Sequence, residues 1–117
     1  YRVKYYNINK LFAKLKLAKA DGSYLKEVDR IEKQDLLILD DFGLQELDNN
    51  KRQAFMEIIE DRHGKKSTII ASQLPIISWH QIIGEQTIAD AILDRLVHSA
   101  HRVELKGESM RRKRKKS

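Results

Sequence analysis

The stretch Asp35-Leu-Leu-Ile-Leu-Asp-Asp-Phe-Gly43, DLLILDDFG, decides the fold, because it joins a short apolar run to two adjacent carboxylates. Consecutive aliphatic residues without alternation are typical of a strand buried on both faces, as in a parallel sheet covered by helices. The strand is predicted over residues 35–40, so that Asp40 and Asp41 lie at its carboxyl end. A buried carboxylate costs free energy unless something offsets its charge, so the two acids require a physical reason.

Strand and helix patterns alternate on both sides of this stretch. The alternation predicts one α/β domain with a mostly parallel sheet and helices on both faces, in which ligands bind at the carboxyl ends of the strands. The helix at 48–63 has Asp48 or Asn49 as its predicted N-cap, and the last helix is expected to open with a capping box at Thr87. The predicted elements are a strand at 2–8, helices at 10–20 and about 25–31, the strand at 35–40, a helix at 48–63, a strand at 67–72, a short helical turn at 76–83, a helix from 87 and a strand at 101–105.

Charge is distributed unevenly along the 117 residues, whose formal net charge is +6. The run 111–116 is entirely basic, and the remaining basic residues balance the 17 acidic ones. We therefore expect a single domain over residues 1–110 and a basic tail over 111–117. Such a tail is either a solvated arm or a segment that contacts nucleic-acid phosphates. The candidate nucleic-acid contacts are Arg112, Lys113, Arg114, Lys115 and Lys116.

No part of the sequence points to a membrane or to an oxidising compartment. Its apolar runs fall short of the roughly 20 residues of a membrane span, and the start YRVKYYN lacks the apolar core of a secretion signal. The chain has no cysteine, which excludes disulfides and thiolate metal sites and is compatible with a reducing cytoplasm. We expect a cytoplasmic protein with no membrane partner.

An aliphatic strand that ends in a carboxylate is the Walker B arrangement of proteins that bind nucleoside triphosphates. In this arrangement Asp40 holds Mg²⁺ through a metal-bound water, and the metal bridges the phosphates of ATP and offsets the buried charge. Asp41 then orients or deprotonates the attacking water, provided that it lies within hydrogen-bond reach. The alternative is that both acids cap the loop or turn after the strand.

Two further segments fit the same hypothesis. The predicted strand 67–72 is followed by Gln73, which could hydrogen-bond the attacking water or the γ-phosphate; alternatively it is a polar strand end that bonds the backbone. Arg95 lies near the end of the last helix and presents a planar fork of donors suited to the phosphate oxygens of a neighbouring subunit's nucleotide. The alternative for Arg95 is an ordinary salt bridge, to Asp94 or Asp90.

Taken together, these segments resemble the IstB-like ATP-binding proteins, the ATPase helpers of one class of bacterial insertion sequence. The resemblance runs from about residue 35 to residue 114, and it is carried in order by LLILDDFGL, IIEDRHGKKSTIIASQLP, WHQIIGE, ADAILDRLVHSAHRVEL and KGESMRRK. That family is similar in turn to helicase loaders of the DnaC type and belongs to the AAA+ ATPases, which are P-loop NTPases.

The resemblance implies a role for each candidate residue. Asp40 matches the Walker B acid linked to magnesium, and Asp41 stands where many relatives carry the longer Glu as the catalytic acid. Gln73 matches the sensor-1 residue, where Asn is commoner, and Arg95 matches the arginine finger. Arg111, in Gly-Glu-Ser-Met-Arg, matches the second-sensor arginine that contacts the nucleotide.

The family also requires a P-loop, G-x-x-x-x-G-K-[ST], and the 117 residues contain none. Gly64-Lys65-Lys66-Ser67 lacks the upstream glycine and leads into a strand, whereas a P-loop leads into a helix. We therefore expect an AAA+ fold truncated before its P-loop and first strand. In the family sheet order 5-1-4-3-2 the absent strand is central, so the strands at 67–72 and 101–105 are each expected to lack a partner. Residues 1–117 alone are expected to be unstable, to associate with another chain or to form only part of a larger ordered molecule. ATP hydrolysis by this segment is expected to be negligible.

The resemblance implies that the intact protein binds ATP and Mg²⁺, hydrolyses the ATP, and assembles on DNA as a homo-oligomer with ATP between its subunits. There it would assist a transposase in selecting a target. One alternative function is a replicative helicase loader of the DnaC type. Another is a non-hydrolysing DNA-binding or scaffold module, in which the basic tail carries the function.

Overall fold

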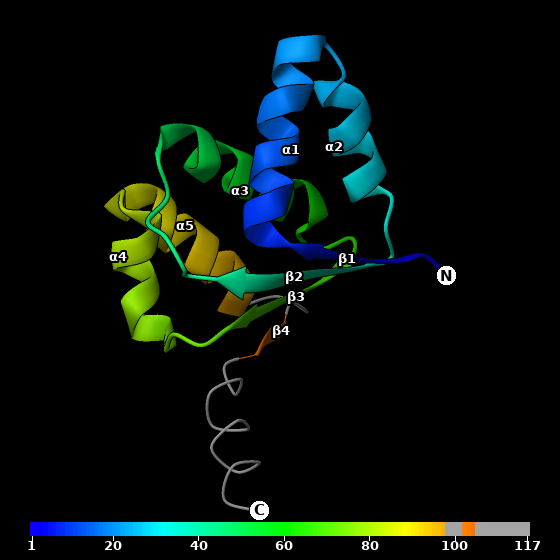
Figure 1. Cartoon of the computed structure of the whole chain (residues 1–117). Helices are drawn as coiled ribbons and strands as arrows, with labels where there is room; N and C mark the ends of the chain where they lie inside the picture. Colours follow the sequence, from blue (N-terminus) through cyan, green and yellow to red (C-terminus); the bar gives the residue numbers. More distant parts are fainter. Residues whose placement is uncertain (98–101, 105–117) are drawn as a thin grey trace, which may run out of the picture.

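A computed structural model describes residues 1–97 and 102–104 and confirms an α/β fold in which strands alternate with helices (Figure 1). Each predicted helix is present near its expected position, and one strand has the predicted bounds. No helix in the described ranges is long and apolar enough to cross a membrane. The elements are β1 (Val3–Asn7), α1 (Ile8–Asp21), α2 (Tyr24–Glu32), β2 (Leu36–Phe42), α3 (Asn49–Arg62), β3 (Ser67–Ser72), a 3₁₀ turn (Ile76–Ser78), α4 (Trp79–Ile83), α5 (Gln86–Val97) and β4 (Arg102–Glu104).

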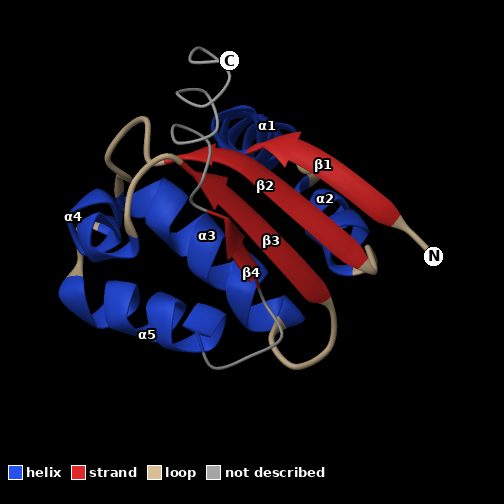
Figure 2. Ribbon diagram, turned by 90° about the horizontal axis from the view of Figure 1, so that it is seen from below, coloured by secondary structure: helices blue, strands red, loops and turns tan. Residues whose placement is uncertain are grey.

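The four strands form one sheet in the order β1-β2-β3-β4, and each pairs in parallel with the next one along the chain. Because every crossover steps to the same side, the right-handed rule for such connections puts all the helices on one face of the sheet. The helices contact one another in one continuous layer, which lies behind the strands in Figure 2. The prediction of helices on both faces is therefore wrong for the described residues.

The other face of the sheet carries apolar side chains that no described helix covers. Val3 and Tyr5 of β1 are 51% and 57% exposed. Leu36 and Ile38, their register partners on β2, are half-buried, as is Ile69, the partner of Ile38 on β3. We call the surface formed by these five residues the open face.

The core lies between the sheet and the helix layer. Leu37 and Leu39 are fully buried there and alternate along β2 with the half-buried residues of the open face. An aromatic cluster continues this core towards the carboxyl edge of the sheet, where the ring of Phe42 lies 5.2 Å from that of Phe55 and 4.5 Å from that of Trp79, centroid to centroid. This packing fixes Phe42, and with it the carboxyl end of β2.

Helix starts follow the sequence signals in one case and depart from them in another. Asp48 caps α3 as predicted, because its side chain accepts a hydrogen bond from the amide of Lys51 at 2.8 Å. The predicted cap at Thr87 is wrong, because α5 begins one residue earlier. The carboxylate of Glu85 takes that role, accepting from the amides of Thr87 and Ile88 at 3.2 and 2.8 Å. These two bonds lower the pKa of Glu85.

Strand β3 has a partner on each side, which corrects the expectation that it would lack one. Its residues Ile69, Ile70 and Ala71 pair in parallel with the three residues of β4. Within the described residues β3 and β4 are therefore direct neighbours in the sheet. The physical reason is that the amide and carbonyl groups of a central strand need partners, and pairing with β4 supplies them.

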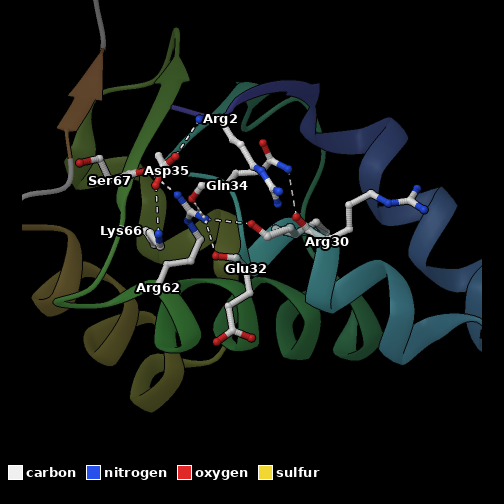
Figure 3. Close-up of polar contacts among 9 residues, drawn as sticks. Arg2, Arg30, Glu32, Gln34, Asp35, Arg62, Lys66 and Ser67 are labelled. Carbon is white, nitrogen blue, oxygen red and sulfur yellow. Dashed lines mark hydrogen bonds and ion pairs between the residues drawn. The ribbon is translucent and has the colours of Figure 1, made fainter.

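A buried arginine joins three parts of the chain at the amino edge of the sheet (Figure 3). Arg62, the last residue of α3, is fully buried and donates to Oγ1 of Thr68 at 2.9 Å. Its guanidinium also donates to the carbonyl oxygens of Ile31, Gln34 and Ser67, at 2.9, 2.8 and 2.6 Å. One side chain thus fastens the end of α3 to the end of α2, to the turn before β2 and to the start of β3.

Candidate functional site

The paired acids lie inside a bulge near the carboxyl end of β2. The strand was predicted to stop at residue 40, but it continues to Phe42, and its register with β3 shifts between Leu39 and Phe42. Strict alternation would turn Asp41 towards the core after Leu39. The extra residue of the bulge instead returns Phe42 to the core and leaves both Asp40 and Asp41 partly exposed.

The backbone of Asp41 has an unusual conformation that makes this bulge possible. Its φ is 63°, the one positive value among the described residues other than glycine. Asp and Asn adopt this left-handed region more readily than other residues with side chains, because a short polar side chain can bond locally. The neighbouring carboxylate reinforces the turn, since Oδ1 of Asp40 accepts a hydrogen bond from the amide of Asp41 at 2.8 Å.

Each acid also receives a hydrogen bond from β1. The hydroxyl of Tyr5 donates to Oδ2 of Asp40. The side-chain amide of Asn7 donates to Oδ2 of Asp41 at 2.9 Å. The hydrogen bond to Asp40, followed by burial and by the charges of both acids, raises the pKa of Tyr5. The acid pair is therefore held from one side by a neighbouring strand.

Asn7 links this site to the start of α1. Its Oδ1 accepts from the amides of Asn9 and Lys10 at 3.0 and 3.2 Å and so caps the helix, while its Nδ2 reaches Asp41. Two acceptor bonds on one end and a carboxylate on the other fix the orientation of the amide group. The side-chain amide of Asn9 adds a bond to the backbone carbonyl of Asp41 at 3.4 Å.

The sequence analysis did not identify Tyr5 or Asn7 as part of the site. The residue type of Asn7 was a signal, because asparagine is a preferred N-cap, but the helix was predicted to begin at residue 10 and in fact begins at Ile8. Its closeness to the acids follows from register alone, since Asn7 pairs with Asp40 across the two strands. Tyr5 carries no comparable local signal.

The end of β3 lies beside the acid pair, as expected from a parallel sheet. Ser72 is buried; its hydroxyl donates to the carbonyl of Phe42 at 2.6 Å and accepts from the amide of Leu74 at 3.1 Å. It therefore ties the carboxyl ends of β2 and β3 together. Gln73 follows directly and is exposed at the same edge of the sheet. The hypothesis that Gln73 acts as a sensor stays a prediction.

Arg95 lies in the last turn of α5 and forms an ion pair with α3. Its Nε is 2.6 Å from Oε2 of Glu60, and its Nη1 donates to the carbonyl of Ala91 at 3.0 Å. Asp90, named above as a possible partner, pairs with His80 at 2.7 Å. Because α5 returns the chain from β3 to the start of β4, its last turn lies towards the amino edge of the sheet. One molecule therefore does not bring Arg95 to its own acid pair.

The remaining predicted site residues lie outside the described residues. They are the predicted nucleotide contact and the five candidate nucleic-acid contacts of the tail: Arg111, Arg112, Lys113, Arg114, Lys115 and Lys116.

The donor set at the acid pair fits magnesium rather than a softer metal. Carboxylate oxygens are hard ligands, and Mg²⁺ usually keeps several waters and binds one or two carboxylates together with substrate phosphates. Within residues 1–97 and 102–104, no group of three or more His, Cys, Asp or Glu side chains could hold a metal ion by itself. Asp40 and Asp41 could therefore contribute to a metal site only together with another group, such as a bound phosphate.

Comparison with known sequences places the chain in a family. All of residues 1–117 match the family described as IstB-like ATP binding protein. The insertion-sequence ATP-binding protein y4pL of Sinorhizobium fredii is 53% identical over 114 residues, which cover 97% of this chain and 46% of the relative. The ATP-binding protein of insertion sequence IS21 from Pseudomonas aeruginosa is 30% identical over 116 residues, covering 99% of this chain and 44% of the relative. The chain thus spans less than half the length of these relatives.

A solved structure agrees with the fold. The crystal structure of the DnaC helicase loader superposes with a TM-score of 0.63 over 86% of this chain and 59% of that chain, at 20% sequence identity. This likeness confirms an α/β fold like that of the helicase loader, and at such low identity it concerns the fold alone. Because the family match extends over residues 1–117 and a relative is 53% identical over 97% of this chain, the chain belongs to the IstB-like ATP-binding proteins.

Proposed function

We propose that this chain forms part of an AAA+ ATPase that binds ATP with Mg²⁺, hydrolyses it, and assists a transposase on DNA. One observation carries the proposal. Two carboxylates, Asp40 and Asp41, lie at the carboxyl edge of a parallel sheet, held by a bulge and by neighbouring side chains, in a member of an ATP-binding family. That edge is where α/β folds of this kind bind their ligands.

Asp40 is the residue that we assign to the metal. Its carboxylate is oriented by the amide of Asp41 and by Tyr5, and each of its oxygens retains acceptor capacity for a metal-bound water. A magnesium ion held there with ATP would supply positive charge that offsets the negative charge of the phosphates during transfer. Asp40 contributes a fixed negative charge at the place where the magnesium waters need an acceptor.

Asp41 is the residue that we assign to the attacking water. Its Oδ2 already accepts a hydrogen bond from Asn7, which fixes the direction of the carboxylate and leaves Oδ1 able to accept a proton or hydrogen bond from water. A positioned carboxylate of this kind contributes about 10²–10⁴-fold to a reaction as a general base. Gln73, exposed at the same edge, is assigned to the γ-phosphate or the same water.

The phosphate-binding loop is proposed to come from elsewhere in a longer polypeptide. Residues 1–117 contain no G-x-x-x-x-G-K-[ST] motif, and the relatives are more than twice as long as the segment that they share with this chain. Backbone amides of such a loop supply most of the contacts to the phosphates. The residues described above would then provide the metal and water side of the site.

Arg95 supports an oligomer with ATP between subunits. It lies towards the amino edge of the sheet and is paired with Glu60, so it cannot serve the acid pair of its own molecule. At the interface with a neighbouring subunit, Arg95 could leave Glu60 and bind the phosphates of that subunit's ATP, to which its guanidinium fork is suited.

DNA and a transposase are proposed as partners because the named relatives belong to insertion sequences. Arg111 is assigned to the phosphates of the nucleotide, and the basic tail is assigned to the phosphates of DNA.

The acid pair can be tested in the natural polypeptide that carries residues 1–117. Asp40→Asn should weaken magnesium-dependent ATP binding by about tenfold or more, because it removes the charge that faces the metal waters. Asp41→Asn should leave binding intact and lower kcat by about 10²–10⁴-fold. Asp29→Asn, which changes an exposed acid paired with Lys33 on α2, is the control and should change neither value. Wild-type protein without magnesium-dependent affinity for ATP would refute the proposal.

The trans role of Arg95 can be tested by mixing two inactive variants. Arg95→Ala should reduce hydrolysis far more than the ATP affinity of the monomer, and Asp41→Asn should also be inactive. An equimolar mixture should recover about a quarter of the wild-type rate, because one interface in four would combine an intact Asp41 with an intact Arg95. No recovery on mixing would contradict a role in trans.

A non-hydrolysing scaffold remains the competing function, and the same measurements separate the two. A scaffold would bind DNA without ATP turnover, and Asp41→Asn would leave all of its properties unchanged. Deleting residues 111–117 tests the tail under either function, because loss of its cations should lower DNA affinity and reduce the dependence of binding on salt concentration.

A further inference from the structure

Tyr5 holds one of the two acids without belonging to any of the motifs that identify the family. It lies in the middle of β1, opposite Ile38 in register, and its hydroxyl crosses to Oδ2 of Asp40. The side chain lies on the open face and the residue is 57% exposed, so its packing contributes little to the core. What the side chain does provide is a directed hydrogen bond to a carboxylate.

The two oxygens of Asp40 are fixed in different ways. Oδ1 accepts from the amide of the next residue, Asp41, which is a local bond within the bulge. Oδ2 is fixed by Tyr5 across the strand pair, over 35 residues of sequence. With both bonds in place, the plane of the carboxylate is determined; with the first bond alone, the group can still turn about it.

An acid that contacts a metal through water depends strongly on its orientation. The metal-bound water donates along a defined direction, and a carboxylate that must first be ordered loses part of the binding free energy. When a group that hydrogen-bonds a metal-linked carboxylate is removed, metal affinity typically falls by about 10–100-fold. Since each carboxylate oxygen has more than one acceptor direction, the bond from Tyr5 does not compete with the water.

We propose that Tyr5 is a positioning residue, which orients Asp40 towards the water shell of a phosphate-bound magnesium ion. This inference rests on the proposed function, because it needs Asp40 to face the metal. It assigns to β1 a direct part in the ATPase site, although the motifs of that site lie on β2, β3 and α5. Its consequence is a change in magnesium dependence and not in the hydrolytic step, which belongs to Asp41.

The chain offers a matched control on the same strand. Tyr6, the next residue, points to the other face, where it packs against the core and its hydroxyl has no hydrogen-bond partner among the described residues. Tyr5→Phe and Tyr6→Phe therefore remove the same oxygen from neighbouring positions. Only the first removal touches Asp40.

The experiment measures ATP affinity against magnesium concentration, with a fluorescent ATP analogue and the natural polypeptide that carries these residues. Tyr5→Phe should raise the magnesium concentration for half-maximal binding about three- to tenfold, which is below the usual range because the hydroxyl is exposed to solvent. It should leave affinity in EDTA unchanged, and kcat at saturating magnesium should stay within about twofold. Tyr6→Phe should match the wild type in all three measurements.

Two outcomes would overturn the inference, and they can be told apart. If the wild type binds ATP in a magnesium-dependent way but Tyr5→Phe behaves like Tyr6→Phe, then Tyr5 has no positioning role and the proposed function stands. If the wild type shows no magnesium dependence, then the proposed function fails and the role of Tyr5 fails with it.

Discussion

Replacing Arg62 with methionine tests whether this arginine holds together the elements at the amino edge of the sheet, because the change removes the guanidinium and largely keeps the side-chain volume. Arg62 is fully buried and donates to three carbonyl oxygens at 2.9 Å or less and to a threonine hydroxyl. Burial lowers the pKa of Arg62, and the nearby Asp35 and Glu32 partly oppose this shift. Among the described residues the guanidinium donates its hydrogen bonds to backbone carbonyls and one hydroxyl, and to no carboxylate.

The magnitude follows from those backbone partners. Replacing both members of a buried ion pair by apolar groups can be neutral, but backbone carbonyls cannot be mutated away. A buried carbonyl left without a donor costs about 1–3 kcal/mol, and water can reach part of this edge, so we take values near the lower end. Arg62→Met should therefore lower the free energy of unfolding by about 3–5 kcal/mol. Arg62→Lys should lose about half as much, because one ammonium group cannot reach every acceptor.

Urea unfolding followed by far-ultraviolet circular dichroism measures this difference. The matched control is Arg30→Met on α2, where the arginine is exposed and pairs with Glu27 at 3.2 Å within one helix turn. Such a pair contributes about 0.5 kcal/mol or less. A loss below about 1 kcal/mol for Arg62→Met, or a loss equal to that of the control, would refute the assignment of Arg62 as a structural clamp.

Three further predictions concern stability and can be read from the same urea titrations. Asp48→Ala should cost about 1 kcal/mol, because α3 loses its N-cap bond; an unchanged midpoint would contradict this. Gly84→Ala should cost about 1–2 kcal/mol, more than Gly22→Ala, because both have positive φ but only the added Cβ at Gly84 meets Arg52, at 2.8 Å. Equal losses would argue against the steric part. Burial, followed by neighbouring glutamates, raises the pKa of Asp61, so its ionised form opposes folding. Asp61→Asn should stabilise the protein by about 0.5 kcal/mol at pH 7, and the gain should disappear below about pH 4, where Asp61 is itself protonated.

Local signals in the sequence were sufficient wherever a single segment determines its own structure. The strand at 67–72 is an apolar run bounded by polar residues, and its bounds were predicted correctly. Asp48 before a helical pattern predicted the start of α3 for the same reason. At α5 the predicted cap was wrong. Thr87 is a residue type that favours an N-cap, but the carboxylate of Glu85, which precedes the helix, accepts from the amides of Thr87 and Ile88.

Features that depend on two distant segments could not be predicted in the same way. The bulge at Asp40 and Asp41 depends on the register between β2 and β3, and no residue within the strand predicts it. The approach of Tyr5 and Asn7 to the acids depends on the pairing of β1 with β2, more than 30 residues later in the chain. The candidate acids were therefore available from the sequence, whereas the groups that orient them were not.

The left-handed backbone at Asp41 limits what can replace this residue. Glutamate is longer by one methylene and lacks the short polar side chain that lowers the energy of a φ of 63°. A β-branched residue would be excluded at this position. Relatives or engineered variants with glutamate at this position should therefore carry a reshaped strand end as well as a longer arm. In this protein, replacing Asp41 by another acid therefore also requires a different backbone conformation in the loop that follows it.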